Sequence, residues 1–337
     1  MERKPRIGLL GLMTGGYEDI FPGILERQLK HGQSIAQILS DDMDVTFERI
    51  GTDQTAIEEI VKEYNHQELD GILIVLLAYS QGAWLVRALK QNRLPVALAV
   101  LQPDDVVESD FEELDLTVNQ GIHGAQDNCN VLMRLGIRYQ VFAGSKHSAD
   151  FKTFAYDFAK AAQTAHTLDR LRVGVMGRMQ GMGDILLDEL AAFQKLGVEI
   201  CHDSLGCVYQ NMQDLEQKEI TTEMEADRDR FDVDPSLSEE SHSTAVAQYL
   251  GFRNYLTANG YGAFTVHFDT VTQDGRFRQL PLYAASRLMA EGYGYAAEGD
   301  VTCAAMVRAG HVLSGAPAGF TEMYMMDQKT QSIIFCH

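Results

Sequence analysis

The sequence predicts an α/β protein made of two similar units, each built on a parallel sheet. Its first half alternates short apolar runs with amphipathic stretches, the pattern of buried parallel strands covered by helices. A second pattern of the same kind begins near Leu171. The length of 337 residues leaves room for two domains and the beginning of a third. We place the boundary near residue 165, within or after an Ala-rich helix expected over Phe151–Leu168.

Each element follows from local periodicity and from turn residues. In the first unit we expect, in chain order, a strand over Arg6–Met13, a helix over Phe21–Leu39, a strand over Val45–Ile50, a helix over Thr55–Tyr64, a buried central strand over Gly71–Leu77, a helix over Gln81–Gln91, a strand over Val96–Leu101 and a short apolar strand just before Asn119. In the second part we expect a strand over Arg172–Met176, a helix from its N-cap Asp184 through Lys195, a strand over Val198–Cys201 and a last strand over Ser332–Phe335.

Composition excludes several classes of partner. Hydrophobic residues make up 45% and charged residues 23%, as in soluble globular proteins, and no apolar run approaches the roughly 18 residues of a membrane span. A formal net charge of −20 opposes binding to nucleic acid and to anionic membranes. The five cysteines form no CxxC pair, and the N-terminus makes a poor signal peptide, so we expect free thiols and a cytoplasmic protein.

Two ligand classes are suggested by local sequence and are not favoured. The glycine-rich loops after the strands at Arg6 and Arg172 do not match GxGxxG, and tight strand-to-helix turns explain them without a nucleotide. The aspartate-rich stretch 214–240 lacks the glycine and the closing glutamate of a calcium loop in register. A solvated helix and loop is the better interpretation of that stretch.

The segment LTVNQGIHGAQD, Leu116–Asp127, carries candidate sugar-binding residues. Asn119, Gln120 and His123 lie close together before a helix, and loops at the carboxyl ends of parallel strands are where ligands bind. Amides and a neutral imidazole can hydrogen-bond sugar hydroxyls, but a capped loop explains the same residues equally well.

The last forty residues contain two carboxylates and one imidazole in apolar surroundings. Glu298 lies where a glycine-rich approach turns into an apolar helix, Glu322 lies in the otherwise uncharged AGFTEMYMM, and His337 follows a strand-like run. Such a set suits a divalent ion of the Mn²⁺ type, provided that the fold brings three separate elements together. Three residues of this kind can also be unrelated.

The same region resembles the central segment of bacterial L-arabinose isomerases, in the L-arabinose/L-fucose isomerase superfamily. The resemblance lies in HFD, QLP, the block RLMAEGYGYAAEGD and the following helix, and in GFTEMYMMD with the strand that ends at His337. TVNQGIHG is similar to the family's NQ-x-x-HGG motif. The matches run from about Leu116 to His337, and the first hundred residues agree only in architecture.

The resemblance implies a fold, a reaction and a set of site residues. The fold is two Rossmann-like, doubly wound α/β domains, here 1–165 and 166–310, followed by a β-rich C-terminal domain of which 311–337 would be the truncated start. The reaction is metal-dependent aldose–ketose isomerisation of a pentose or (deoxy)hexose such as L-arabinose, in a homo-oligomer (trimer or hexamer) with sites near subunit interfaces. The residues implied are metal ligands Glu298, Glu322 and His337, substrate contacts Gln120, His123 and Phe268, and the supporting Asp300 beside the metal.

Aldose–ketose exchange requires a base and an acid for the proton that moves between C1 and C2. We expect Glu298 and Glu322 to share these roles around an enediolate that Mn²⁺ or another divalent cation stabilises. We expect Gln120 and His123 to bind the open-chain hydroxyls.

Three departures from the family pattern qualify this expectation. Val301 replaces the tryptophan usual in the arabinose enzymes, the loop LMTGGYEDIFPG differs from theirs, and the fourth ligand, a histidine, would come from beyond residue 337. The alternative is a non-catalytic sugar-binding or regulatory protein built on two α/β lobes, which would need no metal.

Overall fold

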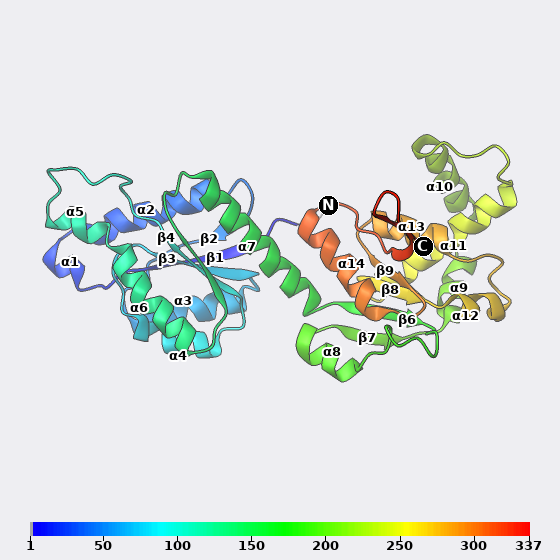
Figure 1. Ribbon diagram of the computed structural model, residues 1–337, viewed down its shortest axis with the longest axis horizontal. Coiled ribbons are helices and arrows are strands. Elements are labelled where there is room, and N and C mark those ends of the chain that lie inside the picture. The colour runs from blue at the N-terminus through cyan, green and yellow to red at the C-terminus, as the bar shows by residue number, and fades with distance from the viewer. Residues whose placement is uncertain (1–2) are drawn as a thin grey trace. The chain divides into compact units, whose positions relative to one another are not determined.

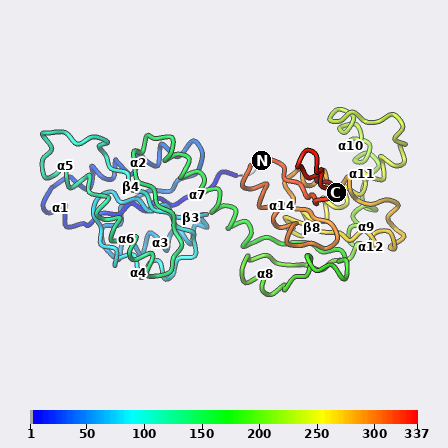
Figure 2. Tube along the Cα trace, viewed as in Figure 1, coloured from blue at the N-terminus to red at the C-terminus, as the bar shows by residue number. Residues whose placement is uncertain are grey.

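The computed structural model describes residues 3–337 and divides into two compact units (Figures 1 and 2). Unit 1 extends to Ala165, and unit 2 runs from His166 to His337. The division falls within helix α7, Ala149–Leu168. Each unit has its own parallel sheet and its own apolar core.

Unit 1 is a five-stranded parallel sheet in the order β2-β1-β3-β4-β5. Its central strand β3 is buried along its whole length because helices cover both faces (Figure 1). One core packs β1 and β3 against α2 and α7, and the other packs the opposite face against α3, α4 and α6. The strands are β1 Arg6–Leu12, β2 Asp44–Thr46, β3 Gly71–Leu76, β4 Val96–Val100 and β5 Tyr139–Ala143. The helices are α1 Tyr17–Ile20, α2 Ile24–Leu39, α3 Gln54–His66, the 3₁₀ turn η1 Gly82–Trp84, α4 Leu85–Gln91, α5 Glu113–Val118, α6 Gly121–Arg134 and α7.

Unit 2 repeats this topology with four parallel strands in the order β7-β6-β8-β9. Helices α9 to α13 share one core with the sheet, and α14 packs against the opposite face. The strands are β6 Arg172–Met176, β7 Glu199–His202, β8 Ala263–Val266 and β9 Gly294–Ala297. The helices are α8 Glu189–Leu196, α9 Leu205–Gln213, α10 Gln217–Arg230, α11 Glu239–Ala258, α12 Phe268–Asp274, α13 Leu282–Ala290 and α14 Val301–Ser314.

A small antiparallel hairpin, β10 Glu322–Asp327 and β11 Ser332–Cys336, follows the second sheet. Its strands are rich in Met, Ile and Phe, and most of these side chains are exposed. Two doubly wound parallel sheets and this hairpin confirm the predicted fold class. The separate third segment expected over 311–337 begins inside α14, so its status as a domain of its own remains a prediction.

The structure corrects three expected elements. No strand precedes Asn119, because a capping box formed by Glu112 and Asp115 starts helix α5 there. Asp184 is not the N-cap of the next helix: the loop after β6 continues to Asp188, whose carboxylate accepts the Ala191 N–H. The strand expected over Val45–Ile50 is shorter and lies at the edge of the sheet as β2.

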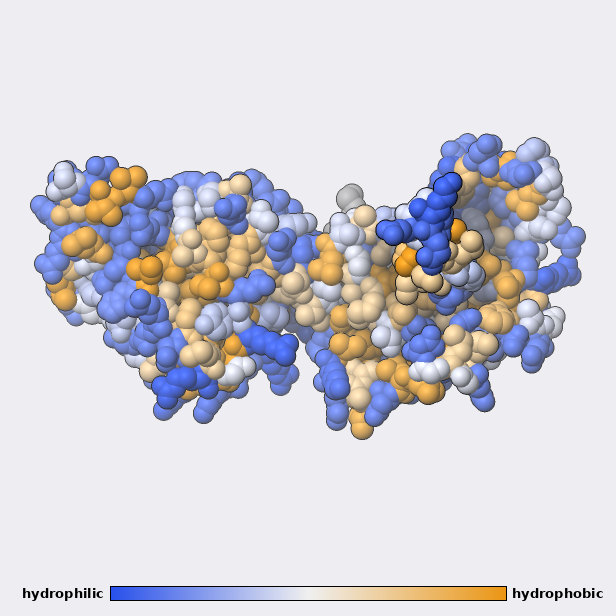
Figure 3. All heavy atoms as spheres, in the orientation of Figure 1, coloured by the Kyte–Doolittle hydropathy of each residue, from blue (hydrophilic) through white to orange (hydrophobic). Residues whose placement is uncertain are grey.

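The surface of each unit mixes apolar and polar side chains on the face that Figure 3 shows. Across residues 3–337, the helices include none with both the length and the apolar character needed to cross a membrane.

Candidate functional site

In unit 2 the candidate site lies at the carboxyl edge of the sheet, where three neighbouring strands end. The strand order passes from β7 and β6 to β8, so β6 and β8 flank the switch point at which doubly wound folds bind ligands. Backbone hydrogen bonds join the ends of these strands: His267 N–H to Met176 O at 3.3 Å, Glu298 N–H to Val266 O at 3.0 Å, and Met179 N–H to Glu298 O at 2.7 Å. The loops that follow β6, β8 and β9 are therefore held side by side.

Glu298 has a backbone conformation that few side chains adopt. Its φ is +67°, in the left-handed region, and the next residue, Gly299, has a φ of +96°. A Cβ at Gly299 would lie 2.6 Å from the Cα of Arg178, so only glycine fits there. The Gly299 N–H donates to the Thr265 hydroxyl at 2.9 Å, which helps to hold the turn. Strain of this kind is typical of functional positions, where the surrounding structure enforces it.

Glu322 and His337 come together at the open end of the hairpin. His337 Nε2 lies 4.0 Å from Glu322 Oε2. The Phe320 ring contacts the His337 ring at 4.7 Å between centroids and the Tyr295 ring of β9 at 6.5 Å. These ring contacts link the base of the hairpin to β9.

Electrostatics connect this pair with Glu298. Burial raises the pKa of the Glu298 carboxyl, and the negative charge of Glu322 raises it further, while His337 and His267 act in the opposite direction. Two carboxylates and an imidazole have the donor chemistry that a Mn²⁺-type ion prefers, and the residues present fit such an ion in that respect. As they stand, no three acidic, His or Cys side chains within residues 3–337 are close enough to hold a metal.

The two other predicted residues of unit 2 lie beside Glu298 or at the end of β8. Asp300 is the N-cap of α14, and its carboxylate accepts the Cys303 N–H at 2.9 Å. Burial, followed by the Asp300 carboxylate, raises the pKa of the Cys303 thiol to about 12. Phe268 is the first residue of α12, is 36% exposed, and its ring lies 5.0 Å from that of His267.

An open hollow of about 600 Å³ lies at the β6/β8 switch point. It is lined by Arg178, Met179, Gln180, His267, Asp269, Thr270, Gln273 and Asp274. Its volume is in the usual range of small-molecule sites. No sequence pattern singled out Arg178 or His267, although His267 directly follows β8 and Arg178 lies two residues after β6.

Gln120 and His123 lie in unit 1, at the start of α6. Gln120 Nε2 donates to the Tyr17 hydroxyl at 3.0 Å, and the His123 ring stacks at 4.6 Å on Tyr79. The Tyr79 hydroxyl in turn donates to Asp127 at 3.3 Å. The structure therefore divides the predicted residues between two polar clusters, one in each unit.

Asn119 has a structural role in the neighbouring loop. Its side chain accepts the Asp104 N–H at 3.0 Å and donates to the Asp104 carboxylate at 2.8 Å. This supports the capped-loop interpretation for that residue.

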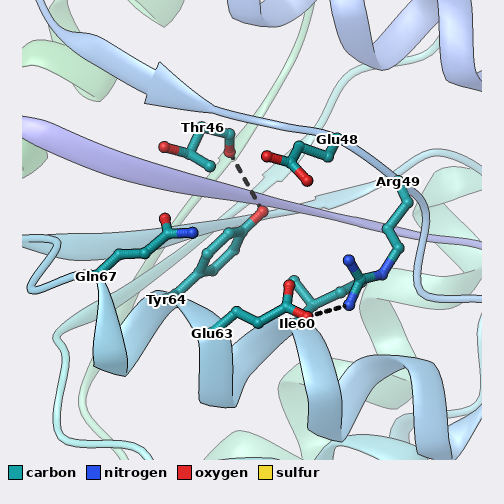
Figure 4. Close-up of a pocket in the computed structure, with 7 residues that line it drawn as sticks. All are labelled: Thr46, Glu48, Arg49, Ile60, Glu63, Tyr64 and Gln67. Atoms are coloured by element: carbon teal, nitrogen blue, oxygen red, sulfur yellow. Dashed lines mark hydrogen bonds and ion pairs between the residues drawn. The ribbon is translucent and has the colours of Figure 1, made fainter.

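A small depression in unit 1 is too small to be a ligand-binding site (Figure 4). It surrounds Tyr64, whose hydroxyl donates to the Thr46 carbonyl at 3.2 Å, and it is closed by the Arg49–Glu63 ion pair at 2.7 Å. Its volume of about 10 Å³ holds no more than about one water molecule.

Comparison with known proteins shows which family this chain resembles. Residues 179–316 match the L-arabinose isomerase central domain. The chain is arabinose-isomerase-like. L-arabinose isomerase from Clostridium beijerinckii is 27% identical to it, over 96% of this chain and 68% of the relative. The enzyme of the same name from Mycolicibacterium smegmatis is 28% identical, over 94% of this chain and 65% of the relative.

The arabinose-isomerase-like chain spans about two-thirds of the length of these relatives. The matched central domain begins in the loop after β6, one residue after Arg178, and ends just after α14. It therefore contains Met179, His267 and Glu298. Among solved structures, a periplasmic solute-binding protein from Actinobacillus succinogenes with bound D-allose aligns over 99% of this chain and 97% of its own at 11% identity. Its TM-score is 0.21.

Proposed function

We propose that this chain provides the catalytic carboxylates of an aldose–ketose isomerase that acts on a pentose or (deoxy)hexose such as L-arabinose. The observation that carries the proposal is Glu298, which follows β9 with a left-handed backbone and whose carboxyl interacts electrostatically with Glu322 and His337. The similarity to L-arabinose isomerases over more than nine-tenths of the chain supports the same reaction class.

Glu298, Glu322 and His337 would hold a divalent cation, Mn²⁺ by donor preference. A bound cation of this kind supplies Lewis acidity to adjacent oxygens of the sugar. Its positive charge would also oppose burial and the negative charge of Glu322, which together raise the pKa of Glu298.

The chain's own side chains would move the proton. We assign to Glu298, which directly follows β9, the role of the base that takes the proton from one carbon of the C1–C2 pair. Glu322 would hold or return a proton on the adjacent oxygen, since one acid and one base are needed. Asp300 would fix the backbone after Glu298, as its N-cap bond indicates.

The remaining site residues would bind the substrate. Phe268 presents a half-exposed ring at the end of β8. Gln120 and His123 offer hydrogen bonds in unit 1, and we propose that they contact the sugar within a homo-oligomer, a trimer or hexamer. The five cysteines are free thiols, which favours a reducing compartment such as the cytoplasm.

Replacement of Glu298 by Gln tests the proposal. We expect Glu298→Gln to reduce Mn²⁺-dependent conversion of a panel of pentoses, hexoses and deoxyhexoses by at least about 100-fold, the usual effect of losing a general base. The matched control is Glu225→Gln, an exposed glutamate on α10, which should keep full activity.

The circular dichroism of both variants should match the parent, and chelation should abolish turnover in the parent and in the control. Near-parental turnover by Glu298→Gln would contradict the assignment. Tight sugar binding with neither turnover nor metal would support the non-catalytic sugar-binding alternative.

A further inference from the structure

The hollow at the β6/β8 switch point contains two hydrogen-bonding nitrogens that lack a partner. Arg178 Nη2 and His267 Nε2 are both buried, and neither makes a hydrogen bond to any of residues 3–337. Guanidinium nitrogens can only donate, so Arg178 Nη2 needs an acceptor that the surrounding residues do not provide. Leaving buried polar groups unpaired costs free energy, and each such group in a folded protein calls for a physical explanation.

The remaining contacts of Arg178 hold the side chain without neutralising it fully. Its Nε donates to the Gly299 carbonyl at 3.3 Å, and its Nη1 lies 3.6 Å from Glu189. Glu189 is also 2.9 Å from His202, so its charge is shared. In contrast, the nearby Arg276 donates from both Nε and Nη2 to Asp274, at 2.5 and 2.6 Å.

The walls of the hollow add further donors. Thr270 and the amides of Gln180 and Gln273 line it, and the Thr270 hydroxyl contacts His267 Nδ1 at 3.3 Å. Arg276 pairs with the lining carboxylate Asp274, whereas the other lining carboxylate, Asp269, has only the His267 ring as its recorded ion-pair partner among the described residues. Asp269 is 57% exposed and lies 3.9 Å from His267 Nε2.

From these contacts we propose that the hollow is an oxyanion subsite, in which Arg178 and His267 bind a phosphate or carboxylate group carried by the ligand. A planar guanidinium with a free nitrogen is suited to the paired oxygens of both groups. Because Arg178 is bonded to the Gly299 carbonyl, the subsite adjoins the turn that carries Glu298.

The proximity to Glu298 gives the subsite a role, which rests on the proposed function. The oxyanion would be the remote end of an acidic or phosphorylated open-chain sugar whose C1–C2 end reaches Glu298. The aldose that the site prefers would then carry a phosphate or carboxylate group at its remote end.

Direct binding tests the subsite without reference to activity. Inorganic phosphate and acetate are titrated separately into the full-length protein by calorimetry. We expect Arg178→Gln to weaken phosphate binding about 10-fold or more, as loss of a charged hydrogen bond does. The control Arg278→Gln removes the same charge at a 76% exposed position of unit 2 and should change the affinity less than about 2-fold.

Two further variants sharpen the result. Asp269→Asn removes a negative charge 3.9 Å from His267 Nε2 and should tighten phosphate binding. Arg178→Lys keeps the charge but loses the paired donors of the planar guanidinium, so its phosphate affinity should lie between those of the parent and Arg178→Gln. Equal phosphate affinities for Arg178→Gln and Arg278→Gln, in folded proteins, would overturn the subsite.

Turnover of matched sugars identifies the source of the oxyanion. Ratios of kcat/KM are compared for a pentose, its 5-phosphate and the corresponding uronate, and we expect the parent to prefer one of the two anionic sugars and Arg178→Gln to lose that preference. Isomerisation of neutral sugars with no phosphate binding would overturn the inference and leave the proposed function standing. Phosphate binding that depends on Arg178, without turnover of any sugar, would support the oxyanion subsite and contradict the proposed function.

Discussion

His31, on α2, shows how burial and hydrogen bonding together fix the charge of a single side chain. Its Nε2 lies 2.7 Å from the Leu101 carbonyl and must donate to it, which leaves Nδ1 to accept from the Lys146 ammonium at 3.1 Å. The ring is therefore neutral. Burial lowers the pKa of His31 to about 4; the Leu101 carbonyl opposes this effect, and the Lys146 charge adds to it.

The depressed pKa predicts acid sensitivity of unit 1. Between pH 6.5 and pH 4 the unfolded chain binds a proton at His31 that the folded chain excludes, so stability falls as the pH decreases through this window. A fall in pKa from 6.5 to about 4, at about 1.36 kcal/mol per pKa unit, corresponds to roughly 3 kcal/mol.

Trp84 provides the measurement, because it is the protein's one tryptophan and packs against a core of unit 1. Urea unfolding followed by its fluorescence should show the loss of stability from pH 6.5 to pH 4, and His31→Gln should flatten it. A variant with the parent's pH slope would show that other groups cause the acid sensitivity.

Among the elements, α10 is held by a buried polar network. Asp227 accepts hydrogen bonds from Tyr283 at 2.5 Å, Arg287 at 2.7 Å and His242 at 3.0 Å. The second terminal nitrogen of Arg287 donates to Glu223 at 2.7 Å, and its guanidinium lies 4.4 Å from the centre of the Tyr249 ring. The network joins α10 to α11 and α13.

We expect Asp227→Asn to destabilise unit 2 by roughly 3 kcal/mol, because it removes one of the two carboxylates that pair with the buried Arg287 guanidinium. Asp229→Asn, on the same helix but exposed, should stay within about 0.5 kcal/mol of the parent. Urea unfolding followed by far-UV circular dichroism measures both. Equal midpoints for the two variants would refute a stabilising role for the network.

Local sequence predicts elements well where local forces decide them. The strands at β3, β4 and β6 and the helices α2 and α3 lie within a few residues of the expected ranges, because their apolar periodicity is strong. The stretch 214–240 is indeed a helix and a loop, yet it is not wholly solvated. Asp227 is buried by partners up to 60 residues away, which no local pattern reveals.

In the candidate site too, some residues can be predicted from the sequence and others depend on contacts between distant segments. The residue types in the last forty residues indicate Glu298, Glu322 and His337 as a candidate metal-binding set, resemblance to a family implies their roles, and these roles remain predictions. Arg178 and His267 could not be singled out, because a nitrogen without a partner is a property of its neighbours in space. The topology alone would have indicated their position at the ends of β6 and β8.

At the scale of the molecule, each unit has apolar cores on both faces of its own sheet. We therefore expect the two units to fold independently when the chain is divided after Leu168, the last residue of α7. The N-terminal piece should keep a cooperative Trp84 transition close to the midpoint of the intact chain. A piece that lacks this transition would show that unit 1 depends on unit 2.

The left-handed backbone at Glu298 also predicts which residue related proteins should carry at this position. Glycine occupies that conformation without strain, whereas a glutamate there costs on the order of 1–3 kcal/mol. A lineage that no longer needs the carboxylate gains stability by a drift to glycine at this position. The residue found there in any descendant therefore indicates whether selection for its chemistry persists.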